Sequence, residues 1–121
     1  MKLHYCDTYA LIEILEENPN YLSLKDKLYV TSRLNLLELH YHLLKKFDLK
    51  CAEDIFKEFR ERCVLFEDED YKLASLFRYK YKKMKFSYID CLGYIYSLRN
   101  NFPFVTGDNA FEGFDNVLFL E

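Results

Sequence analysis

The sequence contains very little glycine and proline, three and two of its 121 residues. This scarcity excludes a collagen-like repeat and argues against a low-complexity, disordered chain. No internal repeat or linker is visible either. Half of the residues are hydrophobic and 31% are charged, and a chain of this length fills one core but not two. We therefore expect a single globular domain over residues 1–121.

Long apolar runs are also absent: no stretch approaches the roughly 20 residues needed to cross a bilayer. Residues 1–7 lack the apolar region of a signal peptide. A cytoplasmic protein without a membrane partner is the expectation. The cysteines form no CxxC pair and have no histidine at zinc-finger spacing, so we expect them to be reduced core residues. They are Cys6, Cys51, Cys63 and Cys91.

Short apolar runs bounded by turn residues alternate with segments of helical periodicity. The strand-like runs are residues 2–6, 28–31, 63–66, 103–106 and 117–120. The helical segments are residues 9–15, 32–47, 51–62, a stretch that starts near 67–70, and 87–99. Parallel strands need crossover connections, which are usually helical. The alternation therefore predicts an α/β fold of three layers, α/β/α, around a central, mainly parallel sheet of about five strands.

Two aspartates follow strand-like runs, at the edge where ligands usually bind in parallel α/β sheets. Asp7 follows the first run, and Asp108 follows the run that ends at Thr106, with Gly107 between them. Glycine at that point suggests a sharp turn of the backbone. The same positions suit capping of a helix or turn, for which aspartate is a preferred residue. The sequence is compatible with either role, ligand or cap.

Glu38 lies beside a stripe of apolar residues at helical spacing, formed by Leu34, Leu37, Tyr41 and Leu44. A carboxylate at this place faces inward or borders a cleft. Because the helix carries leucine on nearly every side, its buried face is ambiguous, and a solvent-facing Glu38 is an equally open interpretation.

Asp90 belongs to the last predicted helix and shares one face with Gly93, Tyr94 and Ser97. This face is mostly small or polar, which suits the wall of a cleft. Asp90 also stands three residues after Ser87, the spacing of a capping box. A cap and a ligand are compatible roles for the same side chain.

If Asp7, Glu38, Asp90 and Asp108 converge, they need a counter-charge, because carboxylates a few ångströms apart repel one another strongly. Oxygen ligands select hard divalent cations such as Mg²⁺ or Mn²⁺. One or two such ions activate a water and stabilise the leaving oxygen when a phosphodiester is hydrolysed. Thr106 is placed to orient this water or the metal. We therefore predict a catalytic metal site built from these five residues.

Four segments in the order found here resemble the motifs of the PIN-domain family, and within it the VapC-type toxins of prokaryotic toxin–antitoxin pairs. They are Asp7-Thr8, Asn35–Leu39, Phe86–Cys91 and Val105–Phe111, the last with a Thr-x-Asp signature. The resemblance covers nearly the whole chain and implies that residues 1–121 form one PIN domain. It also implies an endoribonuclease that depends on Mg²⁺ or Mn²⁺ and whose four acids are all present.

The resemblance further implies partners. Members of this family are usually homodimers, and a cognate antitoxin neutralises them by inserting a peptide, often with an arginine, into the acidic site. Two features fit the family less closely. The connection between Asp7 and Glu38 is short, and neither Asp70 nor Asp115 has a role that the resemblance assigns.

A net charge of −3 is unusual for a protein that binds nucleic acid, so basic residues must be concentrated locally. Residues 78–85 carry five of them, interleaved with Tyr79 and Tyr81, directly before the helix of Asp90. This segment is a candidate RNA-binding site, in which the basic residues contact phosphates and a tyrosine stacks on an unpaired base. A solvated helix end, where cations favour the helix dipole, explains it equally well. The basic residues are Arg78, Lys80, Lys82, Lys83 and Lys85.

Eleven tyrosines and eleven phenylalanines exceed what a small core obviously needs. Aromatic residues are enriched at protein interfaces, so contact with a second protomer or an antitoxin is one explanation of this number. An aromatic-rich core is the other. Two rival functions also stay open: a PIN-type nuclease of RNA processing, and a non-enzymatic module that binds a protein partner.

Overall fold

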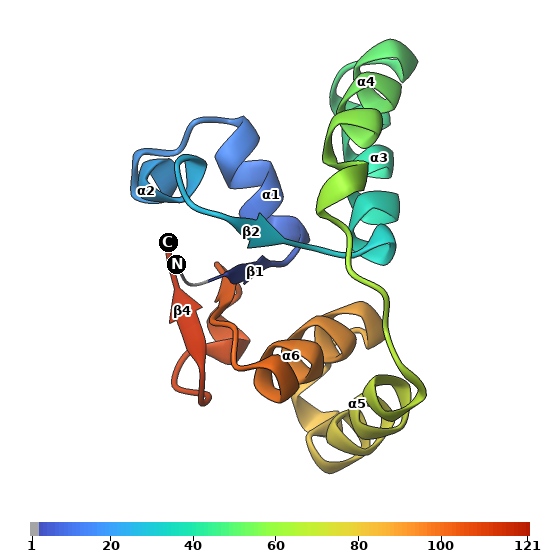
Figure 1. The fold of residues 1–121 in the computed structure, drawn as a ribbon, viewed down its shortest axis with the longest axis vertical. Helices are drawn as coiled ribbons and strands as arrows, with labels where there is room; N and C mark the ends of the chain where they lie inside the picture. The colour runs from blue at the N-terminus through green and yellow to red at the C-terminus, as the bar shows by residue number, and fades with distance from the viewer. Residues whose placement is uncertain (1–2) are drawn as a thin grey trace.

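The computed structural model describes residues 3–121 and alternates between short strands and helices (Figure 1). The strands are β1 (His4–Cys6), β2 (Tyr29–Val30), β3 (Phe104–Thr106) and β4 (Val117–Phe119). The helices are α1 (Thr8–Leu15), α2 (Leu22–Lys25), α3 (Arg33–Lys46), α4 (Leu49–Phe59), α5 (Asp68–Lys80) and α6 (Tyr88–Asn100). Every predicted helical segment contains a helix. The four-residue α2 is too short to give a periodic signal, and Lys2, at the start of the first predicted run, lies outside the described residues.

The strands form one sheet in the order β2-β1-β3-β4, and all three pairings are parallel. β1 and β3 are therefore neighbours although nearly a hundred residues separate them. Their register pairs Tyr5 with Phe104 and Cys6 with Val105. This confirms the predicted parallel α/β architecture, and it brings the carboxyl ends of β1 and β3 together.

The described part of the chain has four strands, one fewer than predicted. The run 63–66 forms only an isolated parallel bridge between Cys63 and Thr31, in which Val64 N donates to Thr31 O over 2.8 Å. The partner segment cannot continue as a strand beyond Thr31, because the next residue, Ser32, caps α3. With no neighbour beyond Thr31, the run has nothing further to pair with.

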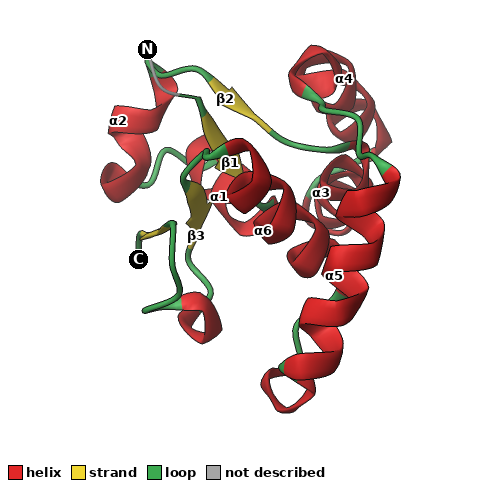
Figure 2. Cartoon of the chain, turned by 60° about the horizontal axis from the view of Figure 1, so that its bottom comes forward, coloured by secondary structure: helices red, strands yellow, loops and turns green. Residues whose placement is uncertain are grey.

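The two faces of the sheet are covered by different helices, which gives the predicted three layers. Successive residues of a strand point to opposite faces. Cys6 and Val105 accordingly join a mainly aliphatic cluster with α1, α3 and α4, whereas Tyr5 and Phe104 join a mainly aromatic cluster with α5 and α6. In Figure 1 the α3–α4 pair lies at the top and the α5–α6 pair at the bottom, and the turned view of Figure 2 shows α5 alongside α6.

The buried face of α3 differs from the predicted stripe. Leu37 and Tyr41 are 61% and 62% exposed, and the core-facing residues are Asn35, Leu36, Leu39 and Leu43. The two sets lie on opposite sides of a helix that carries leucine all round. Periodicity alone could not choose between them.

Many of the aromatic side chains lie in the core, so the core explanation of their number holds for the α5–α6 side. Phe86 stacks on Phe111 with ring centroids 4.2 Å apart, and Tyr94 packs on Phe104 and Phe111. All four cysteines are free; Cys6 and Cys91 are buried, and Cys51 and Cys63 are partly exposed. No helix within residues 3–121 is both long and apolar enough to cross a membrane.

Asp70 has a structural role. Its side chain is buried and accepts a hydrogen bond from Glu67 N over 2.8 Å, which closes a capping box at the start of α5. Its other oxygen lies 2.7 Å from Arg99 Nη1 on α6. The pair ties α5 to α6.

Candidate active site

Asp7 is placed by the end of β1. Its backbone N donates to Val105 O of the neighbouring strand over 3.2 Å, and its Oδ1 accepts from Ala10 N over 2.8 Å. The side chain therefore caps α1, which is the capping role that the sequence allowed beside the ligand role. The residue is only 4% exposed, an unusual position for a carboxylate whose hydrogen-bond partners among residues 3–121 are all neutral. Capping alone does not require such burial.

Thr106 joins Asp7 to Asp108. Its hydroxyl oxygen accepts from Asp108 N over 3.0 Å and donates to the Asp7 carboxylate. Asp108 in turn accepts from Ala110 N through Oδ1 over 3.0 Å. Thr106 is fully buried, and its hydroxyl is bonded to these two aspartates. Its predicted role in orienting water or metal stays a prediction.

Gly107 is not required for the reason predicted from the sequence. Gly113 is the glycine with positive φ in the described chain, and Gly107 does not adopt that conformation. A Cβ on Gly107 would instead lie 2.1 Å from Cε1 of Tyr9. A side chain at this position would displace the ring of Tyr9, which occupies that space.

Glu38 is held in place by side chains of α1 and α3. Its Oε1 accepts from the Thr8 hydroxyl over 2.6 Å, and Thr8 Oγ1 accepts from Asn35 Nδ2 over 3.1 Å. Asn35 Oδ1 accepts from the Tyr5 hydroxyl over 2.6 Å. The carboxylate is thus partly buried and anchored beside the residue that follows Asp7. Sequence reasoning missed Thr8 and Asn35, although Thr8 adjoins Asp7 and Asn35 lies three residues before Glu38, on the same helix face.

Asp90 is part of the capping box that begins α6. Its Oδ2 accepts from Ser87 N and its N donates to Ser87 Oγ, both over 3.0 Å. Of the residues that share this face with Asp90, Tyr94 lines the pocket between α5 and α6, whereas Gly93 and Ser97 do not line it. Both residues are buried, and a Cβ on Gly93 would lie 2.7 Å from Cε1 of Tyr5. The small face lets α6 approach the sheet closely.

The three aspartates act on one another electrostatically. Burial is the main reason that the pKa of Asp7 rises from its ordinary value to about 7, and the charges of Asp90 and Asp108 raise it further. Hydrogen bonds from Thr106 and Ala10 N partly oppose this rise. Burial also raises the pKa of Asp90, with a contribution from the charge of Asp108, while its bonds to Ser87 oppose the rise. A cation among these groups would favour their ionised forms.

The donor set fits a hard divalent cation, although it is not a closed cage. Within residues 3–121, no three His, Cys, Asp or Glu side chains lie close enough to form a ready-made ligand shell. Mg²⁺ usually keeps several waters and takes only one or two protein carboxylates, so it does not need such a shell. The second oxygens of Asp108 and Glu38 accept no hydrogen bond from the described residues. They are available to a metal ion or its waters.

The basic residues predicted to bind RNA follow a path from the end of α5 to the start of α6. Arg78 Nε donates to Phe86 O over 2.9 Å, and its guanidinium lies 4.2 Å from the ring centre of Tyr88. Arg78 thus supports the loop that leads to Asp90. The rest of the set, Lys80, Lys82, Lys83 and Lys85, is exposed. Of the two tyrosines predicted to stack on bases, Tyr81 packs on Phe77 and Phe114.

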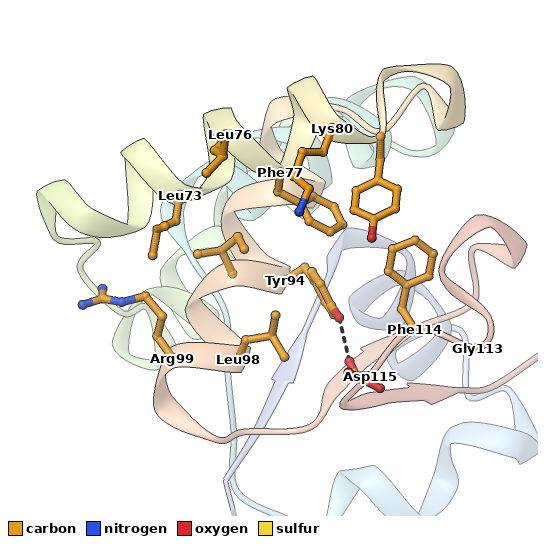
Figure 3. A pocket seen from close by; sticks show the side chains of 12 residues that line it. Leu73, Leu76, Phe77, Lys80, Tyr94, Leu98, Arg99, Gly113, Phe114 and Asp115 are labelled. Atoms are coloured by element: carbon orange, nitrogen blue, oxygen red, sulfur yellow. Dashed lines mark hydrogen bonds between the residues drawn. The ribbon is translucent and has the colours of Figure 1, made fainter.

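A pocket of about 640 Å³ lies between α5, α6 and residues 113–115, and none of the four candidate acids lines it (Figure 3). Leucine and aromatic side chains form most of its wall. The Tyr94 hydroxyl donates to Asp115 O over 2.8 Å at one end, where Figure 3 draws the bond. Asp115 thus supports Tyr94 through its backbone. The acidic residues lie elsewhere, where β1 and β3 end.

Comparison with known proteins agrees with this fold. The family model described as PIN domain matches residues 4–117. A toxin–antitoxin complex from Klebsiella pneumoniae contains a chain of similar fold, with a TM-score of 0.73 and 13% identity, and the match covers 95% of each chain. VapBC2 from Rickettsia felis, bound to a DNA fragment from its promoter, gives a TM-score of 0.70 at 15% identity over 98% of this chain and 99% of that one. No curated protein matches the sequence. With nearly its whole length matched by the family model, the chain belongs to the PIN-domain family.

Proposed function

We propose that this protein is a metal-dependent endoribonuclease whose acidic centre consists of Asp7, Glu38, Asp90 and Asp108. PIN domains are generally nucleases. The observation that carries the proposal is that Asp7 is buried beside carboxylates from separate segments: burial raises its pKa to about 7, and the charges of Asp90 and Asp108 raise it further. A protein keeps such an arrangement at a cost in stability, and perturbed acids of this kind cluster at functional sites.

Mg²⁺ or Mn²⁺ is the proposed cofactor. It would bind among Asp7, Asp90 and Asp108 through one or two of their carboxylates and through waters, with Glu38 reached directly or through water. When bound, a divalent ion of this class lowers the pKa of water and stabilises the charge on phosphate oxygens. The chain's own residues fix the acids. Thr106 holds Asp7 and Asp108, Thr8 holds Glu38, and the Ser87 cap holds Asp90.

RNA is the proposed substrate, and the basic residues Arg78, Lys80, Lys82, Lys83 and Lys85 are the proposed phosphate contacts. Support comes from their position in the chain. Arg78 bonds to the backbone of Phe86, directly before the Ser87 cap of Asp90. Positive charge here offsets the repulsion that a net charge of −3 exerts on phosphates.

The biological role that we propose is that of a toxin in a toxin–antitoxin pair, acting in the cytoplasm as a homodimer and neutralised by a cognate antitoxin. Support comes from the two solved structures, both of which are described as complexes of such pairs. A cationic antitoxin segment would find the same acidic centre that we assign to the metal.

Cleavage of single-stranded and structured RNAs by the purified protein, with Mg²⁺, Mn²⁺ or EDTA, tests the enzymatic proposal. The decisive variant is Asp90→Asn, which keeps the shape of the side chain and removes its charge. The matched control is Asp48→Asn, because Asp48 also caps a helix, accepting from Cys51 N over 2.8 Å, but lies on α4.

We expect wild type and Asp48→Asn to cleave RNA with metal and not with EDTA, and Asp90→Asn to lose at least about 100-fold in rate. Equal cleavage by Asp90→Asn would overturn the assignment of the acidic centre. Absence of cleavage by the wild type, with no shift of its thermal unfolding by either metal, would favour the non-enzymatic binding module instead.

A further inference from the structure

Tyr9 occupies a place in the acidic site that the metal chemistry does not use. It follows Asp7 and Thr8 on the first turn of α1, and one face of its ring lies against Gly107, the residue between Thr106 and Asp108. The side chain is 43% exposed. An aromatic ring thus bridges the two segments that end β1 and β3 and still faces solvent.

The fit between Tyr9 and Gly107 is specific. A Cβ on Gly107 would lie 2.1, 2.5 and 2.7 Å from Cε1, Cδ1 and Cζ of the ring. Any other residue at 107 would therefore displace Tyr9. The backbone at this point has no positive φ that would by itself require glycine, so the presence of glycine between Thr106 and Asp108 is explained by the ring.

The ring of Tyr9 also differs from other exposed tyrosines, because one face lies against Gly107 and no charged or aromatic side chain of the described residues covers the other. Tyr88 is covered by Arg78 at 4.2 Å, and Tyr79 has Lys82 at 5.3 Å. Within residues 3–121, no cation or second aromatic ring lies on Tyr9, and its hydroxyl makes no hydrogen bond to those residues. A large apolar surface is left open beside a group of carboxylates.

We propose that Tyr9 is a nucleobase-binding residue, whose ring stacks on an unpaired base of single-stranded RNA beside the phosphate to be cleaved. This inference rests on the proposed ribonuclease function and specifies the form of its substrate. Carboxylates repel phosphates, so near the acids the RNA needs a contact that does not depend on charge. Stacking on an aromatic ring is such a contact, and it accepts every base because each has a π-face.

Stacking requires the base to be unpaired or flipped out, since a paired base is already covered on both sides by its neighbours. The proposed contact therefore selects single strands, loops and ends over continuous duplex. It also fixes the position of a nucleotide relative to Asp7 and Asp108. The ring belongs to the residue two positions after Asp7 and packs on Gly107, directly before Asp108.

The test compares wild type with Tyr9→Ala, Tyr9→Phe and Tyr9→Leu on short single-stranded RNAs. Cleavage with Mg²⁺ gives KM and kcat. Binding in EDTA is followed through 2-aminopurine placed at each position in turn, because its fluorescence falls when it stacks. Tyr71→Ala is the matched control, since Tyr71 is a similarly exposed tyrosine, 51%, on α5.

We expect Tyr9→Ala and Tyr9→Leu to raise KM about 5- to 100-fold and to abolish the fluorescence change, with a much smaller effect on kcat. Tyr9→Phe keeps the ring and should retain the fluorescence change, and Tyr71→Ala should behave as wild type. Gly107→Ala tests the same contact without removing the ring. It should raise KM in the wild type and have little further effect in Tyr9→Ala, because both changes remove one interaction.

The outcomes separate this inference from the proposed function. Metal-dependent cleavage with the same KM in wild type, Tyr9→Ala and Tyr9→Leu would overturn the base-binding role and leave the nuclease in place. Fluorescence quenching that depends on Tyr9 without any cleavage would support base binding and overturn the nuclease. If Tyr9→Ala fails to fold, Tyr9→Leu and Gly107→Ala give the same decision, since both keep an apolar side chain at position 9.

Discussion

The acids at the edge of the sheet and the acids on the helices reach the candidate site in different ways. Asp7 and Asp108 stand one and two positions after neighbouring parallel strands, so the register of β1 and β3 places them together. Glu38 and Asp90 are brought to the site by the packing of α3 and α6 on opposite faces of that sheet. The first pair depends on strand pairing, and the second on helix packing.

The anchor of Glu38 differs from those of the edge acids, whereas Asp90, like them, accepts from a backbone N–H, that of Ser87. The edge acids are held by backbone N–H groups and by the buried Thr106, and Asp7 is almost entirely shielded from water. Glu38 is held by the Thr8 hydroxyl and stays partly open to solvent. We infer that burying charge at the sheet edge costs more stability than placing charge on α3. Bound metal should therefore stabilise the edge most.

The largest expected effects are those of Asp7→Asn and Glu38→Gln on the rate of RNA cleavage and on thermal stability. Both variants should lower the rate of RNA cleavage by at least about 100-fold, because each removes a charged ligand. Their metal-free stabilities should differ. Asp7→Asn keeps the cap and removes a buried charge, so its melting temperature should rise, whereas Glu38→Gln should change it little. Thermal unfolding in EDTA measures this, and equal shifts in both variants would contradict the comparison.

A smaller effect is expected from pH. Burial raises the pKa of Asp7 to about 7 in the folded protein, compared with about 4 in an unfolded chain. The folded state then binds more protons than the unfolded state between these values, so stability falls as pH rises. This contribution is complete below about pH 4 and is lost as pH passes about 7.

The measurement is thermal or chemical unfolding at pH 5 and pH 8 in EDTA. The wild type should lose on the order of 2 kcal/mol more than Asp7→Asn over this interval, and added Mg²⁺ should reduce the loss. Other titrating groups are common to both proteins and cancel in the difference. A parallel pH dependence of the two proteins would show that Asp7 is not the group responsible.

The same contrast explains how far the sequence could predict the site. Asp7 and Asp108 were recognisable because a strand-like run ends just before each. Glu38 was assigned to a helix correctly, but its surroundings were not, because leucine on all sides of α3 hid the buried face. Gly107 was misread because a glycine that frees the backbone and a glycine that makes room for a ring look alike in one sequence. That difference depends on Tyr9, a residue about a hundred positions away.

The smallest expected effects come from the two threonines that hold the acids. Thr106→Val keeps the shape but removes the hydroxyl between Asp7 and Asp108, and Thr8→Val removes the hydrogen bond to Glu38. Loss of a group that orients a metal ligand typically costs about 10- to 100-fold. We expect Thr106→Val near the upper end, because it holds two acids, and Thr8→Val near the lower end, because it holds one.

Serine at either position is the control, since it restores the hydroxyl and should recover most of the cleavage rate. The two valine variants should also separate by stability. Thr106→Val should steepen the loss of metal-free stability with rising pH, because the hydroxyl that lowers the pKa of Asp7 is gone. Thr8→Val should leave that slope unchanged. If both variants lose activity equally and neither alters the slope, the sheet edge and the helices support the acids in the same way, and the distinction between them fails.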